Sequence, residues 1–199
     1  MMVETTKDFW NKKYRNNKTG WDIGAIATPI KEYIDQLDSK NLTILIPGSG
    51  NSWEAEYLFQ NQFMNTNVID ISKLAIKRFT KRFPQFPSKN IFEQNFFDHT
   101  QEYDLIIEHT FFCALTPNLR SDYVKKMHLL LKPQGKLVGL LFDRPLNKDH
   151  PPFGGSLAEY WELFEPYFQI KKMEPAKNSI PPRKGSELFI LLIKKEITI

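Results

Sequence analysis

Apolar residues follow two patterns along the chain. A continuous apolar, β-branched run, such as Leu42–Ile46, is typical of a strand buried on both faces of a parallel sheet. Amphipathic stretches between such runs predict helices that cover the sheet. We expect strands at residues 42–46, 67–71, 90–93, 103–108, 136–142, 167–173 and 187–194. We expect helices at residues 4–15, 28–37, 52–60, 73–83 and 117–131, and one more that begins at Ser156.

Local signals mark the ends of several of these helices. Thr28–Pro29 has the pattern of an N-cap followed by proline at the first helical position. Ser72 is a good N-cap for the helix that follows it, and Ser156 with Glu159 forms a capping box. Lys132–Gly135 carries the proline and glycine of a helix stop followed by a turn.

The order of the predicted elements indicates the fold class. Strands that alternate with helices imply a parallel sheet covered by helices on both faces. The last two strands follow each other without a helix, which predicts an antiparallel hairpin at the edge of the sheet. We therefore expect an α/β, Rossmann-like fold of seven strands, mostly parallel, with an antiparallel C-terminal edge strand. No internal repeat or Gly/Ser linker divides the chain, so we expect residues 1–199 to form a single domain.

Composition narrows the possible classes of function. Apolar residues make up 41% of the chain and charged residues 25%, which argues for a folded domain over a disordered chain. The net charge is +4, but the basic residues form no stripe or reading motif, so we expect no nucleic-acid partner. The single Cys113 excludes an internal disulfide and a cysteine zinc cluster, and we expect no metal site.

The N-terminal residues and the apolar runs indicate the cellular location of the protein. Residues 1–18 are polar and charged, without the apolar centre of a signal peptide. No apolar run approaches the roughly 18 residues that a membrane helix needs. We therefore expect a soluble, cytoplasmic protein without a membrane partner, either a monomer or a weak homodimer.

A glycine-rich turn, Pro47–Gly50, follows the first buried strand and opens a helix. Such turns bind nucleotide-like cofactors, because glycines let the backbone bend sharply and lie close to a ligand. Asp70 stands about 20 residues further on, at the end of the second strand, where an acid accepts hydrogen bonds from ribose hydroxyls. A tight loop beside a helix-flanking carboxylate is the alternative, but the register of strand, turn, helix and acid favours a cofactor site.

The residues after this turn discriminate among cofactors. A dinucleotide fold needs a third glycine where this chain has Trp53, which could not fit beside a pyrophosphate. No Lys-Ser or Lys-Thr pair follows the turn, so a phosphate-binding P-loop is also excluded. S-adenosylmethionine has no phosphate and needs only close backbone approach near its amino-acid portion. It is therefore the expected cofactor.

Several motifs along the chain resemble the thiopurine S-methyltransferase superfamily of class I S-adenosylmethionine-dependent methyltransferases, and its thiol and halide branch most of all. The resemblance runs from Trp10 to about Phe168. Its most specific motifs are Gly20–Gly24 (Gly-Trp-Asp-Ile-Gly) and Thr110–Ala114 (Thr-Phe-Phe-Cys-Ala). The other landmarks are Phe9–Trp10, Pro47–Gly50, Val68–Ser72, Asn95–Asp98, Tyr103–Glu108, Leu130–Pro133 and Pro151–Phe153.

The resemblance implies a layout for the cofactor site. An N-terminal segment, residues 1–28, is expected to fold over the cofactor. Gly48 is expected beneath the amino-acid portion, Asp70 at the ribose, Asn95 at the adenine and His109 near the methionine end. The cofactor-binding residues implied are Trp10, Tyr14, Trp21, Gly48, Ser49, Gly50, Asp70, Ile71, Asn95, Phe96 and His109.

Plainer interpretations stand beside several of these assignments. Trp10 also fits a hydrophobic staple that only anchors the terminus. Phe96 and Phe111–Phe112 also fit plain core, and His109 also fits a loop histidine with a satisfied hydrogen bond. The chain also departs from the family pattern at four of the site positions. Ser52 and Glu54 replace a common Gly and Asp, Asn95 replaces Asp, and His109 replaces Arg or Tyr.

The acceptor side is less defined by the sequence. Tyr14, His109 and Arg144 are candidates for orienting an anionic acceptor, and the loop Asp143–Gly155, with His150 and Phe153, is expected to line that side. A thiolate, hydrosulfide or halide needs little or no deprotonation, so no obligatory catalytic base is implied. The leading hypothesis is methyl transfer to a thiol, hydrosulfide, thiopurine or halide. Transfer to an oxygen, nitrogen or metalloid acceptor, and cofactor binding without turnover, are the alternatives.

Overall fold

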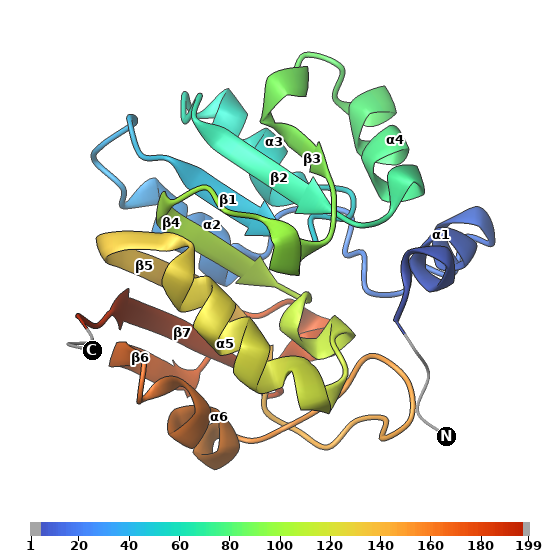
Figure 1. Cartoon of the computed structure of the whole chain (residues 1–199). Coiled ribbons are helices and arrows are strands. Elements are labelled where there is room, and N and C mark those ends of the chain that lie inside the picture. The colour runs from blue at the N-terminus through green and yellow to red at the C-terminus, as the bar shows by residue number, and fades with distance from the viewer. Residues whose placement is uncertain (1–4, 197–199) are drawn as a thin grey trace.

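The computed structural model describes residues 5–196, built around a seven-stranded sheet in the order β3-β2-β1-β4-β5-β7-β6 (Figure 1). The strands are β1 (Ile44–Pro47), β2 (Thr66–Asp70), β3 (Ile91–Glu93), β4 (Tyr103–His109), β5 (Leu131–Phe142), β6 (Phe168–Pro175) and β7 (Glu187–Lys194). Strands β1 to β5 pair in parallel, and β7 runs antiparallel to both β5 and β6. The predicted mostly parallel α/β sheet with a C-terminal antiparallel hairpin is confirmed, and the reversed strand lies second from the edge.

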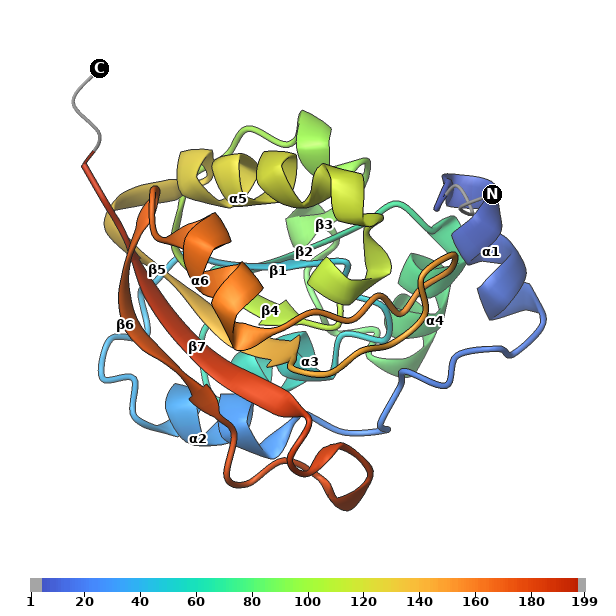
Figure 2. The ribbon, with the colours of Figure 1, turned by 90° about the horizontal axis from the view of Figure 1, so that it is seen from below.

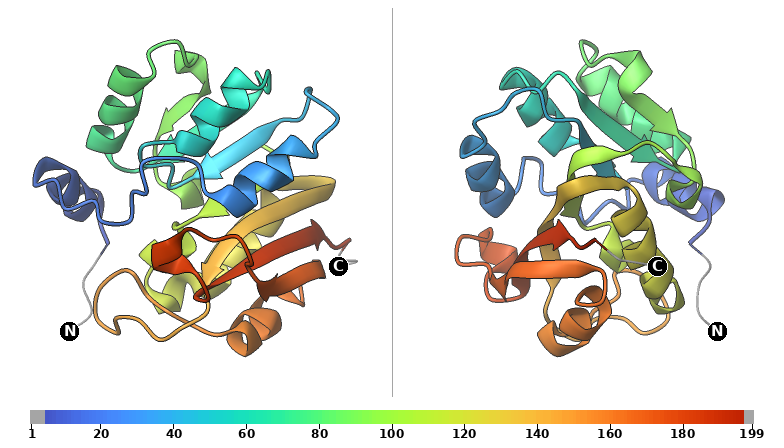
Figure 3. Two further views of the ribbon diagram at one scale, coloured as in Figure 1. Left: turned by 180° about the vertical axis from the view of Figure 1, so that it is seen from behind. Right: turned by 60° about the vertical axis from the view of Figure 1, so that its left-hand side comes forward.

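Helices cover both faces of this sheet. The longer ones are α1 (Lys7–Arg15), α2 (Thr28–Asp35), α3 (Trp53–Gln60), α4 (Lys73–Arg82), α5 (Arg120–Leu129) and α6 (Leu157–Phe164). Figure 2 shows α5 and α6 on one side of the sheet and α2 and α3 on the other, and the left view of Figure 3 looks onto the second side. No helix within residues 5–196 combines the length and the apolar character needed to cross a membrane.

Alternation along the strands divides the core into two layers. Leu45 and Ile106 pack into an aromatic-rich layer beneath α5 and α6, with Tyr123 and Phe164. Ile46 and its neighbours face the opposite layer, beneath α2, α3 and α4. Because successive side chains of a strand point to opposite faces, a strand buried on both faces must be apolar at every position. The continuous apolar runs of the sequence are explained in this way.

The site is positioned by the sheet edge where the parallel strands end. Strand β1 lies between β2 and β4, and the chain order reverses there, which makes this edge a topological switch point. The turn after β1, Asp70 at the end of β2 and His109 at the end of β4 meet at this edge. Helix α1 packs beside this edge on α4, where the side-chain oxygen of Asn11 accepts a hydrogen bond of 2.9 Å from the Ser72 hydroxyl.

Two predicted boundaries are wrong. Ala27 is the N-cap of α2, because its carbonyl accepts the first intrahelical bond from Lys31 at 2.9 Å, and Thr28 is the first helical residue. The helix predicted to reach Leu131 ends at Leu129, after a separate 3₁₀ turn at Pro117–Leu119. Leu131 instead pairs with Tyr103 as the first residue of β5, so strand pairing overrides its helical preference.

Other end signals behave largely as expected. The predicted turn at Lys132–Gly135 lies within the bounds of β5, where the pairing with β4 shifts register between Leu131 and Lys136. The Ser72 hydroxyl caps α4 by accepting from the Ala75 N–H at 3.2 Å. The Ser156 hydroxyl accepts from the Glu159 N–H at 3.3 Å, whereas the Glu159 carboxylate pairs with Arg120. Residue 4, where the first helix was expected to begin, lies outside the described residues, and within them the helix begins at Lys7, with Thr6 as its N-cap.

Candidate functional site

A cavity of about 1110 Å³ opens at the carboxyl ends of the strands. Its volume is large enough for a ligand of nucleoside size together with a small second molecule. The candidate residues that line it are Trp10, Tyr14, Trp21, Gly48, Ser49, Gly50, Asp70, Ile71, Asn95, Phe96, His109 and Arg144. One continuous cavity therefore brings together the glycine turn, the N-terminal aromatic residues and the end of β4.

The turn after β1 forms the floor of this cavity from backbone atoms. Gly48 and Gly50 have φ angles of +56° and +55°, a region that favours glycine. A Cβ atom on Gly48 would lie 2.2 Å from a ring carbon of Phe111, and one on Gly50 would lie 3.0 Å from the Tyr14 hydroxyl. Both glycines are therefore required by the backbone conformation and by the close approach of aromatic side chains.

Asp70 is buried beside this turn and is held by two backbone groups. One carboxylate oxygen accepts from the Gly50 N–H at 2.9 Å, and the other accepts from the Ser72 N–H at 2.7 Å. Burial raises the pKa of Asp70 to about 6, although the two hydrogen bonds oppose the shift. Each oxygen keeps a free lone pair, so the carboxylate can still accept hydrogen bonds from a ligand hydroxyl.

The N-terminal segment packs three aromatic side chains over the cavity. Trp21 meets Trp10 and Tyr14 edge to face, with ring centroids 5.5 and 5.7 Å apart. Tyr14 is buried, and burial together with the nearby Asp70 carboxylate raises its pKa. Arg78 of α4 donates to the Tyr14 carbonyl and holds the end of α1 in place. The three aromatic residues therefore form a cluster, in contrast to a single staple at the terminus.

The Trp-Asp-Ile-Gly motif owes its form to Asp22. One Asp22 oxygen accepts from the Trp53 indole at 2.7 Å and from the Gly24 N–H at 3.0 Å, and the other accepts from the Asn51 side chain. Gly24 has a φ of +74°, which suits glycine in this tight turn. Trp53, whose bulk argued against a dinucleotide, thus anchors the N-terminal segment to the start of α3.

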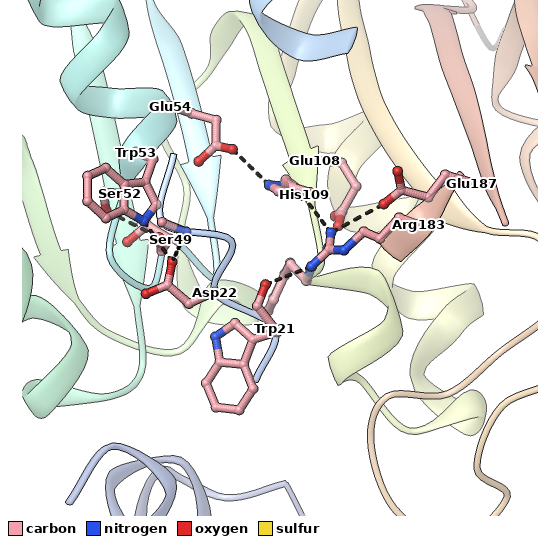
Figure 4. A network of polar contacts seen from close by, with 12 residues as sticks. Trp21, Asp22, Ser49, Ser52, Trp53, Glu54, Glu108, His109, Arg183 and Glu187 are labelled. Atoms are coloured by element: carbon pink, nitrogen blue, oxygen red, sulfur yellow. Dashed lines mark hydrogen bonds and ion pairs between the residues drawn. The ribbon is translucent and has the colours of Figure 1, made fainter. Parts of the chain in front are cut away.

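His109 is fully engaged by other residues of the site (Figure 4). Its Nδ1 lies 2.7 Å from a carboxylate oxygen of Glu54, and its Nε2 lies 2.8 Å from the Arg183 guanidinium. Burial would raise the pKa of Glu54, but the contact with His109, together with hydrogen bonds from the backbone N–H groups of Glu54 and Ala27, holds the pKa below its usual value. Neither Glu54 nor Arg183 was assigned to the site from the sequence, and their separation along the chain gave no signal that they meet.

Glu108 supports the turn that follows β4. Its buried carboxylate accepts from the N–H groups of Phe111 and Phe112 at 2.8 and 2.9 Å, and from the Tyr123 hydroxyl at 2.5 Å. Burial raises the pKa of Glu108, and these hydrogen bonds oppose the shift only in part. Thr110 between them has a φ of +62°, a strained conformation for a β-branched residue. Glu108 thereby fixes the backbone that places Phe111 against Gly48.

The loop Asp143–Gly155 contributes only part of what was expected. Arg144 lines the cavity, together with Phe142, Pro151 and Pro152. His150 is exposed, with Nδ1 3.0 Å from the Pro151 carbonyl, and does not line the cavity. Phe153 is buried in the protein and donates its N–H to the Cys113 carbonyl at 2.7 Å. The expectation that His150 and Phe153 line the acceptor side is therefore corrected, because one points outward and the other is core.

Asn95 and Phe96 lie on the remaining wall. The side-chain oxygen of Asn95 accepts from the Phe97 N–H at 3.1 Å and caps the 3₁₀ turn Phe96–Asp98. The side-chain NH₂ of Asn95 is then free for a ligand. Phe96 is buried against Phe111 and Tyr123, so it belongs to the core as well as to the cavity wall. Within residues 5–196 no three histidine, cysteine or acidic side chains come together as a potential metal site.

Comparisons with known proteins agree with this architecture. The chain is 30% identical over 193 residues to the probable thiol methyltransferase 2 of Arabidopsis thaliana, covering 94% of this chain and 85% of that protein. It is 28% identical over 187 residues to the thiocyanate methyltransferase 1 of the same plant, covering 89% and 81%. The solved structure of the Burkholderia thailandensis 1,6-didemethyltoxoflavin-N1-methyltransferase, with S-adenosylhomocysteine bound, shares the fold, with a TM-score of 0.76 at 14% identity over 96% of this chain and 87% of that chain.

The family assignment rests on nearly the whole described chain. The sequence model of the thiopurine S-methyltransferase family matches residues 5–192, which include the N-terminal aromatic cluster, the glycine turn and the C-terminal hairpin. The resemblance seen in the motifs is therefore confirmed, and so is the expected cofactor. The chain belongs to the thiopurine S-methyltransferase family and is a methyltransferase that uses S-adenosylmethionine.

Proposed function

We propose that this enzyme methylates a small sulfur or halide nucleophile, such as a thiol, hydrosulfide, a thiopurine or iodide, that reaches the cavity as an anion. The observation that carries the proposal is the lack of a free proton acceptor on the acceptor side of the cavity, among the described residues. Both ring nitrogens of His109 are within hydrogen-bond distance of other side chains. Burial raises the pKa of the Cys113 thiol to about 12, so the thiol stays protonated at neutral pH and cannot accept a proton from the acceptor molecule.

The shape of the cavity fits the cofactor. The left-handed glycines at 48 and 50 bring the backbone close enough to receive its amino-acid portion. We assign Asp70 to the ribose hydroxyls, Asn95 and Phe96 to the adenine, and Trp10, Tyr14 and Trp21 to its cover. Ser49 lies within the glycine turn and Ile71 follows Asp70, and both line the same cavity. All of these side chains line one continuous space, which supports the assignment.

The acceptor side combines apolar surface with two cations. Phe111, Phe142 and Pro151 form its apolar wall, and Arg144 and Arg183 bring positive charge to it. When bound, the cofactor supplies an electrophilic methyl group on a sulfonium centre. The apolar wall strips water from a nucleophile and aligns it, and the cations attract an anion into the cavity. A nucleophile that is already ionised needs no base, which matches the groups present here.

A methyl-transfer assay with a panel of acceptors tests the proposal. Purified enzyme and S-adenosylmethionine are incubated with hydrosulfide, iodide, a simple thiol and a thiopurine, and with a phenol and an amine as oxygen and nitrogen acceptors. We expect transfer to at least one sulfur or halide acceptor and none to the phenol or the amine. Transfer only to the phenol or the amine would support the second hypothesis. Binding of S-adenosylhomocysteine without any transfer would support a non-catalytic binding protein.

Organisation and location complete the proposal. All described elements build one sheet with its two helix layers, which supports a single domain over residues 1–199. The aromatic cluster of α1 and Trp21 supports a cofactor-covering role for residues 1–28, of which 1–4 lie outside the described part. We further propose a cytoplasmic enzyme without a nucleic-acid or membrane partner, present as a monomer or a weak homodimer. Size-exclusion chromatography with light scattering measures the last of these directly.

A further inference from the structure

Two buried residues that line the cavity contact each other. Glu54 stands near the start of α3 and His109 at the end of β4, 55 positions apart in the sequence, and they meet at 2.7 Å. Both are nearly buried, with side chains 6% and 9% exposed. The pair therefore links the start of α3 to the end of β4.

Arg183 extends this pair toward the C-terminal hairpin (Figure 4). It lies at the end of the 3₁₀ turn Pro181–Arg183, between β6 and β7, and is buried at 7% exposure. Its Nη1 lies 2.8 Å from His109 Nε2 and 3.2 Å from a carboxylate oxygen of Glu187. Its Nη2 donates to the Trp21 backbone carbonyl at 2.6 Å, across 162 positions of sequence.

The donors in this network determine the protonation of His109. A guanidinium can only donate, so Nε2 of His109 must accept from Arg183. Nδ1 then carries the proton and donates it to Glu54. His109 is therefore a neutral bridge between a carboxylate and a guanidinium, with its tautomer set by both neighbours. The same geometry orients the Arg183 fork, because one arm is held by His109 and Glu187 while the other reaches Trp21.

The Trp21–Asp22 loop is therefore anchored on two sides. Asp22 is fixed to the start of α3 through Trp53 and Asn51. Trp21 is fixed through its carbonyl to Arg183, and its indole holds Trp10 and Tyr14 in the aromatic cluster. In the described residues, Arg183 is the side chain that joins this N-terminal segment to the turn between β6 and β7 by a hydrogen bond.

We propose that Arg183 is a positioning residue that latches the N-terminal segment over the cofactor site through the Trp21 carbonyl, with His109, Glu54 and Glu187 holding the latch in place. The inference rests on the proposed function in one respect, that the segment covers the cofactor. Entry and release of the cofactor then require this contact to open, so the latch controls how long the product S-adenosylhomocysteine stays bound.

The test removes the latch without leaving a buried charge alone. The double variant Arg183→Gln with Glu187→Gln removes the contact to Trp21 and neutralises both members of the buried pair. The single variant Glu187→Gln keeps the Trp21 contact, because the glutamine side-chain oxygen can still accept from Arg183, and it controls for the lost carboxylate. Lys184→Gln, at an exposed neighbouring position, is the matched surface control. Arg183→Lys is a further variant, which keeps the positive charge but lacks the planar fork that reaches two partners.

The first measurement is hydrogen exchange of the ligand-free proteins. We expect peptides within residues 5–24 to exchange about tenfold faster in the double variant, because a hydrogen bond from a charged donor contributes about that factor. Peptides from β4 and α5 should exchange at the wild-type rate. Arg183→Lys is expected between the two, and both Glu187→Gln and Lys184→Gln close to wild type.

The second measurement is the dissociation rate of S-adenosylhomocysteine in stopped flow. The double variant is expected to release it about tenfold faster and to raise the KM for S-adenosylmethionine by a similar factor. Equal exchange of residues 5–24 in the wild type, the double variant and Arg183→Lys would overturn the latch. Failure of the wild type to bind S-adenosylhomocysteine would instead defeat the proposed function, so the two failures are distinguishable.

Discussion

The floor of the cofactor site is made by the turn Pro47–Gly50 and by Asp70, which belong to one strand–helix–strand unit, whereas the network around His109 joins residues from four distant segments. On the cofactor side, Asp70 and Gly50 bond across 20 positions, within one strand–helix–strand unit. In the network around His109, hydrogen bonds connect Glu54, His109, Arg183 and Trp21 across 55, 74 and 162 positions. Backbone conformation therefore builds the first region, and buried side-chain pairs build the second.

The difference predicts different responses to substitution. A backbone-built site fails when the backbone can no longer adopt its conformation, so single changes there should abolish binding. A side-chain network that orients without proton transfer should lose affinity or residence time in smaller steps. The following variants test whether the two regions separate in this way.

Gly48→Ala is expected to have the largest effect. The new methyl group would lie 2.2 Å from the Phe111 ring, at a φ of +56°. We expect no thermal shift with millimolar S-adenosylhomocysteine, whereas the wild type at 100 times its dissociation constant should gain about 2.7 kcal/mol. Gly20→Ala is the matched control, because its Cβ meets nothing within 4 Å. A wild-type thermal shift with S-adenosylhomocysteine in Gly48→Ala would contradict the claim that the cofactor site requires glycine at position 48.

Asp70→Asn is expected to weaken S-adenosylhomocysteine binding by about 10- to 100-fold, through loss of hydrogen bonds to a charged acceptor. The wild type should show a matching pH dependence. As pH falls through about 6, the carboxylate gains a proton and the ligand affinity should decrease. Calorimetric titration from about pH 5 to 8 measures this, and an affinity that is flat in the wild type would contradict the ribose assignment.

The stability of the ligand-free protein should respond to the same proton with the opposite sign. The pKa of Asp70 is raised in the folded state, so the folded protein holds that proton more tightly than the unfolded chain. The contribution of Asp70 to the free energy of unfolding should therefore increase as pH falls from about 6 toward the usual carboxyl range. Denaturant unfolding of wild type and Asp70→Asn across these pH values isolates the contribution.

His109→Gln tests whether His109 acts as a base or only bridges Glu54 and Arg183. Glutamine can donate to Glu54 and accept from Arg183, but it cannot act as a base at neutral pH. We expect kcat to fall less than about tenfold, because a general base would contribute about 10²- to 10⁴-fold. Initial rates at saturating substrates measure the difference. A loss of a thousandfold with normal S-adenosylhomocysteine binding would make His109 a base and contradict its role as a bridge.

Arg144→Gln is expected to have the smallest effect. Arg144 is exposed at the cavity, so solvent screens its attraction for an anion to about 1 kcal/mol or less. The KM for an anionic acceptor should rise by about two- to fivefold, and less at high salt. His150→Gln serves as its control, since His150 points away from the cavity. A change of the same size in both variants would remove Arg144 from the acceptor side.

The contrast between the two regions also explains what the sequence could predict. The run Leu42–Ile46, the glycine turn and Asp70 follow local rules of strands and turns, and the structure places them at one edge of the sheet. Leu131 was misplaced because its pairing with Tyr103 depends on a distant strand. Ala27 was missed as an N-cap because it has no capping side chain.

The acceptor side resisted prediction for a physical reason. Arg183 follows two prolines in an ordinary-looking loop, and nothing local indicates that its guanidinium is buried beside His109. Phe153 and His150 were expected at the cavity because they are close to it in sequence, but the loop turns one residue inward and the other outward. The sequence singled out Glu54 only as a departure from the resembled family, and its contact with His109 is visible only in the structure.

The rate of methyl transfer to iodide as a function of pH tests the central claim most directly. Iodide carries no proton and needs no base, so the assay asks directly whether an anion that arrives already ionised is methylated. We predict transfer with a kcat that stays constant between about pH 7 and 9, in the wild type and in His109→Gln alike. A basic limb in the wild type that disappears in His109→Gln, or methyl transfer confined to oxygen or nitrogen acceptors, would contradict the account.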